Sequence, residues 1–197
     1  VNLILLSLFS YAIFLVVTFS FVRKYFKEKI ALLFTVLLTF SPLNMAMARR
    51  ALVDSTANLF LVGTIFLFFE NLQERNPYKK ALWVLVYAFS ILIKEGSALL
   101  SVFFLFYLLI QRYLFKRKVR LAEFGLQTLL AFGVAGSAYV VLAGGWMPFL
   151  KTAVSVLTST GINNYALVFC AGPWFRYLLD FLVLSPWVFI LATGYSI

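Results

Sequence analysis

The chain has 197 residues, of which 63% are hydrophobic and only 12% are charged. Soluble domains average roughly 45–50% apolar and about 25% charged residues, and a chain of this size could not hide so much apolar surface in one core. The composition therefore excludes soluble, fibrous and disordered proteins and predicts an integral membrane protein. One cysteine excludes a disulfide framework, and the lack of histidine excludes histidine-based acid–base chemistry and most zinc sites.

The formal net charge of +10 comes largely from three short basic runs that lie between long apolar stretches. Loops rich in Lys and Arg mark the cytoplasmic side of a membrane protein, so we interpret the charge as an orientation signal and expect no nucleic-acid partner. Binding of anionic membrane-lipid headgroups by these loops is a second interpretation. The runs are Arg23, Lys24, Lys27 and Lys29; Arg75, Lys79 and Lys80; and Arg112, Lys116, Arg117, Lys118 and Arg120.

The apolar stretches predict an all-α, polytopic transmembrane helix bundle, organised as a single transmembrane domain over residues 1–197. About 20 apolar residues cross the hydrocarbon layer as a helix. If the three basic loops are all cytoplasmic, an even number of crossings separates them, and the N-terminus lies outside. The seven predicted spans are residues 1–22, 30–48, 51–69, 81–93, 97–110, 121–143 and 177–193.

The fourth and fifth predicted spans are short and are separated by Lys94, Glu95 and Gly96. At about 1.5 Å per residue, the fourth extends only about 20 Å, against roughly 30 Å of hydrocarbon. Unless both helices extend into their basic flanks, Lys94 and Glu95 lie below the outer membrane surface. Ionisable groups at that depth normally face a water-filled cavity or a partner. A solvated external hairpin is the alternative.

Residues 144–176 form the only long segment predicted on the non-cytoplasmic side, after Gly144 and Gly145 end a span. A loop this long beside tight hairpins is more often functional than connective. Within it, residues 152–157 fit part of an amphipathic helix lying on the membrane. Because the chain begins at Val1 rather than Met, within a span, we expect an internal fragment of a longer membrane protein.

The charged residues outside the basic runs gather on the predicted outer side. Their cations suit a phosphate-bearing ligand, because Arg binds phosphate in a bidentate manner and Lys supplies a point charge. A carboxylate among them could bind a metal ion or a sugar hydroxyl, or act as a base. Simple intrahelical pairs, Arg50 with Asp54 and Arg176 with Asp180, are the alternative. The full set is Arg49, Arg50, Asp54, Lys94, Glu95, Lys151, Arg176 and Asp180.

Three sequence motifs lie in these outer segments. Residues 41–54 begin with SP and end with RRALVD, residues 92–96 read LIKEG, and residues 172–187 contain GPWFRYLLD followed by LSPW. In this order they resemble membrane glycosyltransferases of the GT-C superfamily. The resemblance is to the branch related to protein O-mannosyltransferases and aminoarabinose lipid A transferases, and the motif at residues 172–187 is its most specific part.

The resemblance implies an enzyme of the cell membrane that transfers a sugar from a polyprenyl-phosphate donor to a protein, lipid or glycan acceptor on the non-cytoplasmic face. Asp54 matches an acidic position that lines the site and in some members helps to bind a metal, here a divalent cation such as Mg²⁺ or Mn²⁺. Lys94, Arg176 and Arg50 are expected near the donor phosphate, and Glu95 is a further candidate for the acidic role. The family's principal catalytic carboxylate would precede Val1, so the fragment is expected to be inactive alone.

A transporter or flippase of an anionic lipid or solute is the alternative function. Interrupted helices and intramembrane charges occur in such proteins too. However, the sequence has no obvious repeat, and its polar residues cluster outside rather than at the midplane. These two observations favour the transferase.

Overall fold

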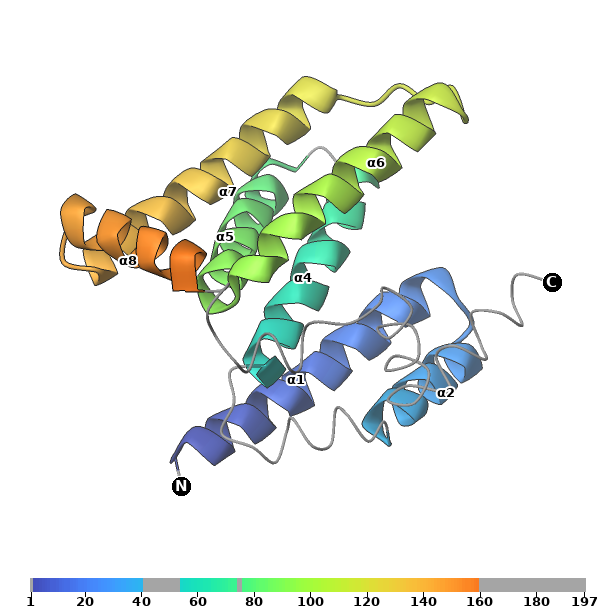
Figure 1. Ribbon diagram of the computed structural model, residues 1–197. Coiled ribbons are helices and arrows are strands. Elements are labelled where there is room, and N and C mark those ends of the chain that lie inside the picture. Colours follow the sequence, from blue (N-terminus) through green and yellow to red (C-terminus); the bar gives the residue numbers. More distant parts are fainter. Residues whose placement is uncertain (1, 41–53, 74–75, 160–197) are drawn as a thin grey trace, which may run out of the picture.

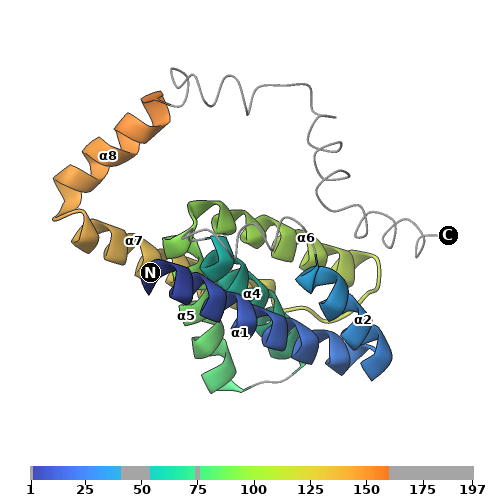
Figure 2. The ribbon, with the colours of Figure 1, turned by 90° about the horizontal axis from the view of Figure 1, so that it is seen from below.

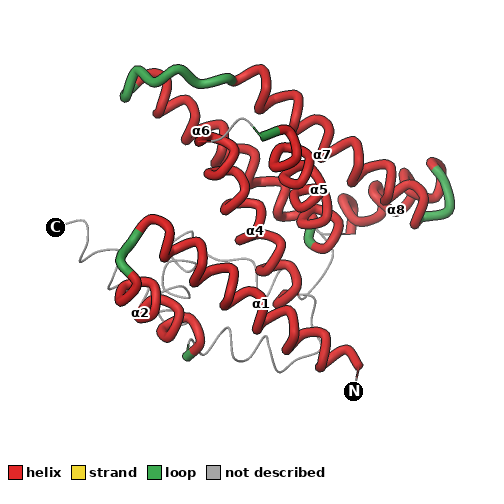
Figure 3. The backbone as a smooth tube through the Cα atoms, turned by 180° about the vertical axis from the view of Figure 1, so that it is seen from behind, coloured by secondary structure: helices red, strands yellow, loops and turns green. Residues whose placement is uncertain are grey.

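The computed structural model describes residues 2–40, 54–73 and 76–159. Over these residues the chain forms seven α-helices, one short 3-10 helix and no strand (Figure 3). The predicted all-α class is therefore confirmed. The elements are α1 (Asn2–Tyr25), α2 (Glu28–Thr39), α4 (Asp54–Gln73), α5 (Pro77–Ile93), η1 (Glu95–Leu99), α6 (Leu100–Tyr113), α7 (Leu121–Leu142) and α8 (Trp146–Ser159).

Helix α4 runs through the middle of the bundle, with α1 and α2 on one side and α5, α6 and α7 on the other (Figure 1). Four stretches of the described chain are long and apolar enough to cross a membrane, which confirms a polytopic transmembrane bundle. They are Ile4–Tyr25, Asp54–Leu72, Glu95–Tyr113 and Leu121–Leu142. The predicted span at residues 177–193 lies outside the described residues.

The two short spans are longer than the sequence predicts. Helix α5 begins at Pro77, four residues early, because the Asn76 side chain accepts the N–H of Tyr78 at 2.9 Å and proline suits the first helical turn. Its 17 residues extend about 25 Å. The next span reaches from Glu95 to Tyr113. Both helices thus extend into their basic flanks, so the segment between them lies nearer the outer end than the predicted boundaries imply.

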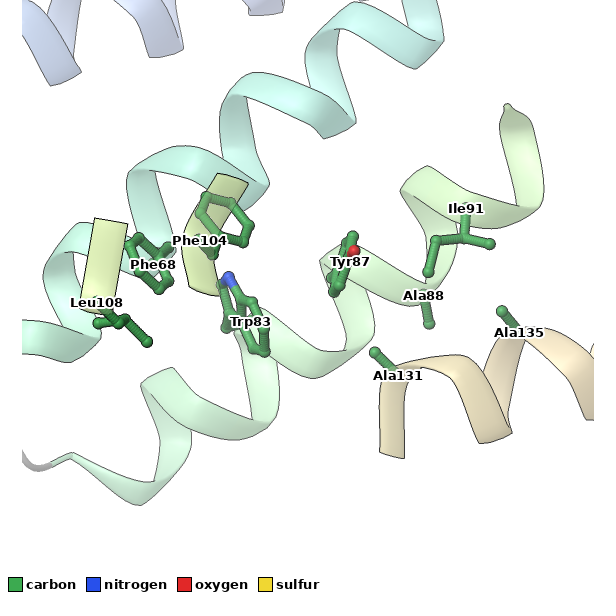
Figure 4. Packing of buried hydrophobic residues seen from close by; sticks show 9 residues of the cluster. All are labelled: Phe68, Trp83, Tyr87, Ala88, Ile91, Phe104, Leu108, Ala131 and Ala135. Carbon is green, nitrogen blue, oxygen red and sulfur yellow. The ribbon is translucent and has the colours of Figure 1, made fainter. Parts of the chain in front are cut away.

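The hydrophobic core is built around α5 (Figure 4). The rings of Phe68 and Phe104 stack with their centroids 4.1 Å apart, and the Trp83 indole donates a hydrogen bond to the Thr64 carbonyl at 3.0 Å. On α7, Ala131 and Ala135 lie one turn apart and are fully buried. Small side chains allow membrane helices to approach closely, which explains how α7 packs against α5.

A polar seam joins α1 to α4. The Ser7 hydroxyl donates to that of Ser55 at 3.2 Å, and the Thr56 hydroxyl donates to that of Ser10 at 3.1 Å. Hydroxyl pairs of this kind hold membrane helices together, because the hydrophobic effect gives no preference for helix–helix over helix–lipid contact. The seam therefore fixes α1 beside the first turn of α4.

The three basic runs lie at one end of the bundle. Glu70, near the end of α4, forms ion pairs with Lys24 from the first run and Lys79 from the second. Lys80 from the second run forms an ion pair with Glu123, which follows the third run in the first turn of α7. This agrees with the even number of crossings predicted between the runs. The side of the membrane on which this end lies stays a prediction.

A tight turn at Gly144 and Gly145, with φ angles of 80° and 128°, separates α7 from α8. Such positive values favour glycine because it lacks a Cβ atom. Helix α8 then runs away from the bundle (Figure 2) and includes residues 152–157, where the sequence predicts helix. Leu150 and Val154 share one face of α8 and Thr152 lies on the opposite face, so the helix is amphipathic. Its position on a membrane surface stays a prediction.

Candidate active site

An ion pair between Asp54 and Lys94 marks the end of the bundle opposite the basic runs. The Lys94 ammonium donates to Asp54 Oδ1 at 2.8 Å. Asp54 is the first residue of α4, and Lys94 directly follows the last residue of α5. A carboxylate at a helix N-terminus and a cation at a helix C-terminus are both stabilised by the helix dipole. The pairing of α4 with α5 therefore brings together two of the residues that the sequence singles out.

The Lys94 ammonium is accessible while it is held. The Lys94 side chain is 56% exposed and the Asp54 side chain 22%. A lysine ammonium carries three donors, of which the bond to Asp54 uses one. Over the described residues we find no other partner for the Lys94 ammonium group. The remaining donors can therefore face an anionic group brought by a substrate.

Three hydroxyl groups hold the segment that carries Lys94. The Tyr139 hydroxyl donates to the carbonyl oxygens of Ile91 at 2.9 Å and Leu92 at 3.2 Å. On the other side of Lys94, the carbonyl of Ala98 accepts from Tyr87 at 3.0 Å and from Ser101 at 2.6 Å. Side chains from α5, α6 and α7 thus fix both flanks of Lys94.

Sequence reasoning missed Tyr139 as a residue that positions the site. It is one of ten tyrosines in the chain and lies in an apolar span, where aromatic residues commonly face lipid or the core. No sequence signal separates it from the other nine. Its role depends on the packing of α7 against α5, which only the structure supplies.

Of the other predicted site residues, the structure describes some as exposed and leaves others outside the described residues. Glu95 begins η1, is exposed and forms no ion pair among the residues that the structure covers. Lys151 is exposed on α8. Arg50 and Arg176 lie outside the described residues. Of the residues expected around the donor phosphate, the structure therefore places Asp54 and Lys94 in contact and leaves the position of Arg176 a prediction.

Asp54 is the residue that the sequence predicts as a possible ligand of a divalent cation. No group of three or more Asp, Glu, Cys or His side chains in the described segments could hold one. The described partner of Asp54 is an ammonium group, whose positive charge would repel a second cation at the same carboxylate. Binding of Mg²⁺ or Mn²⁺ by Asp54 therefore stays a prediction that rests on the family resemblance.

The fold and this charged pair define a polytopic membrane protein with a polar site at one end of its helices. Residues 1–136 match the family described as dolichyl-phosphate-mannose-protein mannosyltransferase. The chain belongs to this family and is a membrane glycosyltransferase of the GT-C superfamily. The matched region contains Asp54, Lys94 and Glu95, and membership favours the transferase over the transporter.

The motif at residues 172–187 lies beyond the matched region. No curated protein and no solved structure matches the chain.

Proposed function

We propose that the protein transfers a sugar from a polyprenyl-phosphate donor to an acceptor hydroxyl at the end of the bundle that carries Asp54 and Lys94. The observation that carries this proposal is the Asp54–Lys94 ion pair, 2.8 Å long and open to an incoming anion. The family description, which names a dolichyl-phosphate-linked sugar, supports a donor of this class. We place this end on the non-cytoplasmic face of the cell membrane, because the basic runs occupy the other end.

In the proposed reaction, the acceptor hydroxyl oxygen attacks the anomeric carbon of the sugar. The bond between that carbon and the phosphate oxygen breaks, and its electron pair leaves with the polyprenyl phosphate. Negative charge therefore grows on the leaving phosphate. Preorganised cations stabilise such charge most strongly in a poorly hydrated site. Lys94 supplies this cation, and Asp54 keeps its ammonium in place.

The proton of the acceptor hydroxyl passes to a carboxylate within hydrogen-bond reach. Asp54 is one candidate, because its second oxygen, Oδ2, has no hydrogen-bond partner among the described residues. Glu95, exposed beside Lys94, is the other. The acceptor can be a protein, a lipid or a glycan, since each offers a hydroxyl group.

Kinetics of Lys94 variants in the intact protein test this proposal. With the protein in liposomes and the donor lipid titrated, Lys94→Ala is expected to raise the apparent KM for the donor by about tenfold or more, because a charge-assisted contact to phosphate is lost. Lys94→Arg keeps the charge and is expected to retain part of the affinity. Lys27→Ala, which removes an exposed cation at the opposite end of the bundle, is the control. An unchanged KM in Lys94→Ala would contradict the proposed role.

A further inference from the structure

A cavity of about 330 Å³ lies between α4, α5, α6 and α7, at the end of the bundle where the basic runs meet. Small-ligand pockets have volumes of roughly 300–1,000 Å³. Phe68, Trp83 and Phe124 form an aromatic wall of the cavity, and the first two also belong to the core in Figure 4. The cavity thus has an apolar wall formed by aromatic rings.

The polar wall of the cavity is strongly cationic. Its lining includes Arg117 and Lys118 from the third basic run, and neither forms an ion pair in the part of the chain that the structure describes. Glu123 is the one carboxylate among the lining residues, and it already pairs with Lys80 and Arg120, which also line the cavity. An excess of positive charge therefore remains for an anion, and Arg with Lys is the combination that suits phosphate.

Two buried amide oxygens in the lining have no hydrogen-bond partner among the residues that the structure describes. They are Asn71 Oδ1 and Gln111 Oε1. The Asn71 amide nitrogen donates to the Lys79 carbonyl at 3.5 Å, whereas the amide oxygen makes no hydrogen bond to a described residue. A buried acceptor without a donor is destabilising, and a hydroxyl group on a ligand would satisfy it. The cavity lining therefore suits a ligand that carries hydroxyl groups as well as a phosphate.

The surroundings of the cavity suit a lipid. Leu126 and Leu130 lie one turn apart on α7 beside the cavity residue Gln127, and both are exposed. They offer an apolar surface to an acyl chain. The loop above the cavity is fixed to α6, because the Arg117 N–H donates to the Gln111 carbonyl at 2.9 Å. A soluble anion would contact Arg117 and Lys118 but would leave the apolar surface of Leu126 and Leu130 uncovered.

We propose that this cavity binds the headgroup of an anionic membrane phospholipid that carries free hydroxyl groups. Arg117 and Lys118 contact its phosphodiester, Asn71 and Gln111 accept from its hydroxyls, and its acyl chains lie along α7. This site is separate from the Asp54–Lys94 pair. Lys80 on α5 and Lys94, which directly follows α5, are 14 positions apart, which corresponds to about 21 Å along the helix axis.

Lipid binding to the intact protein in neutral detergent tests the proposal without any measurement of transfer. The probe is phosphatidylglycerol. We expect it to bind more tightly than phosphatidylethanol, which has the same phosphodiester without hydroxyls, and far more tightly than zwitterionic phosphatidylcholine. In the double variant Arg117→Gln, Lys118→Gln, the affinity for phosphatidylglycerol is expected to fall by about tenfold or more, because two charged donors are lost.

A matched control removes the same charge elsewhere at this end. Lys27 and Lys29 are exposed, belong to the first basic run and do not line the cavity. Their double Gln variant is expected to keep its affinity for phosphatidylglycerol. Gln111→Leu is expected to narrow the difference in affinity between phosphatidylglycerol and phosphatidylethanol, because one of the two hydroxyl acceptors is gone.

Three results would overturn the proposal. If the double variant at Arg117 and Lys118 bound phosphatidylglycerol as tightly as the wild type, the cavity would not be the lipid-binding site. An equal loss in the Lys27 and Lys29 variant would reduce the effect to general surface charge. Competition by free glycerol phosphate as strong as that of the lipid would assign the cavity to a soluble anion.

Discussion

The Lys94 ammonium contacts the Asp54 carboxylate at 2.8 Å, although 40 positions separate the two residues in the chain. The pair joins the start of α4 to the end of α5. At the other end of α4, Glu70 binds Lys79, just after the start of α5, at 3.0 Å. Ion pairs therefore connect these two helices at both ends, and only the pair at Asp54 leaves its lysine largely exposed.

Replacement of Asp54 by Asn is expected to abolish transfer. The variant keeps the size of the side chain but loses the carboxylate, which holds the Lys94 ammonium and can accept the proton of the acceptor hydroxyl. We therefore expect the turnover to fall by at least about a hundredfold. Initial rates with a polyprenyl-phosphate sugar measure the effect, and thermal unfolding checks that the fold persists. Glu28→Gln, an exposed carboxylate on α2, serves as control. Unchanged turnover in Asp54→Asn would remove this residue from the site.

The Tyr139 hydroxyl is expected to matter for donor binding although it is not a catalytic group. Tyr139→Phe removes its hydrogen bonds to the carbonyls of Ile91 and Leu92, so the segment before Lys94 is held less firmly. We expect the KM for the donor to rise by about three- to tenfold, which corresponds to one hydrogen bond, while kcat changes less. Tyr113→Phe, at an exposed position of α6, is the comparison. Equal effects in both variants would refute the positioning role.

Glu70 is expected to contribute to stability rather than to transfer. It is only 6% exposed and pairs with Lys24 and Lys79, so Glu70→Gln removes the carboxylate from both of these ion pairs. We expect a loss of about 2 kcal/mol in the free energy of unfolding, seen as a lower thermal midpoint in detergent. The KM for the donor should not change, because the site lies at the other end of α4. A midpoint equal to that of wild type would show that the ion pairs add little.

Close packing between α7 and α5 predicts that a larger side chain at position 131, in place of Ala131, destabilises the protein. This residue is completely buried, so Ala131→Leu forces α7 away from α5 and is expected to lower the free energy of unfolding by about 1–3 kcal/mol. Ala122→Leu adds the same atoms at an exposed position of α7 and should be neutral. Denaturation in mixed micelles compares the two. Similar stabilities would contradict the packing described here.

The sequence predicts much of the helix layout because hydropathy and turn residues are local signals. Helix α7 ends at Leu142, one residue before the predicted boundary, because the two following glycines take left-handed backbone angles. The start of α5 was predicted at Ala81 and found at Pro77. That error arose because hydropathy ignores the polar first turn, whereas Asn76 caps it.

The candidate site was predictable as a set of residues but not as a geometry. Hydropathy places Asp54 and Lys94 at the same end of the bundle, because each lies at the outer end of a predicted span. Their direct contact depends on which helices are neighbours, and no local pattern encodes that. The ion-pair partners of Glu70 could not be predicted for the same reason. Its position close to a basic run is nevertheless a sequence signal that could have indicated a role in ion pairing.

Donor cleavage is the reaction on which the functional account depends. The most direct test incubates the intact protein with a panel of polyprenyl-phosphate sugars and measures release of polyprenyl phosphate in the presence of hydroxyl acceptors. We predict release from at least one donor, coupled to a glycosylated acceptor and lost in Asp54→Asn. Movement of a donor lipid across the membrane without any cleavage would contradict the account and favour a flippase.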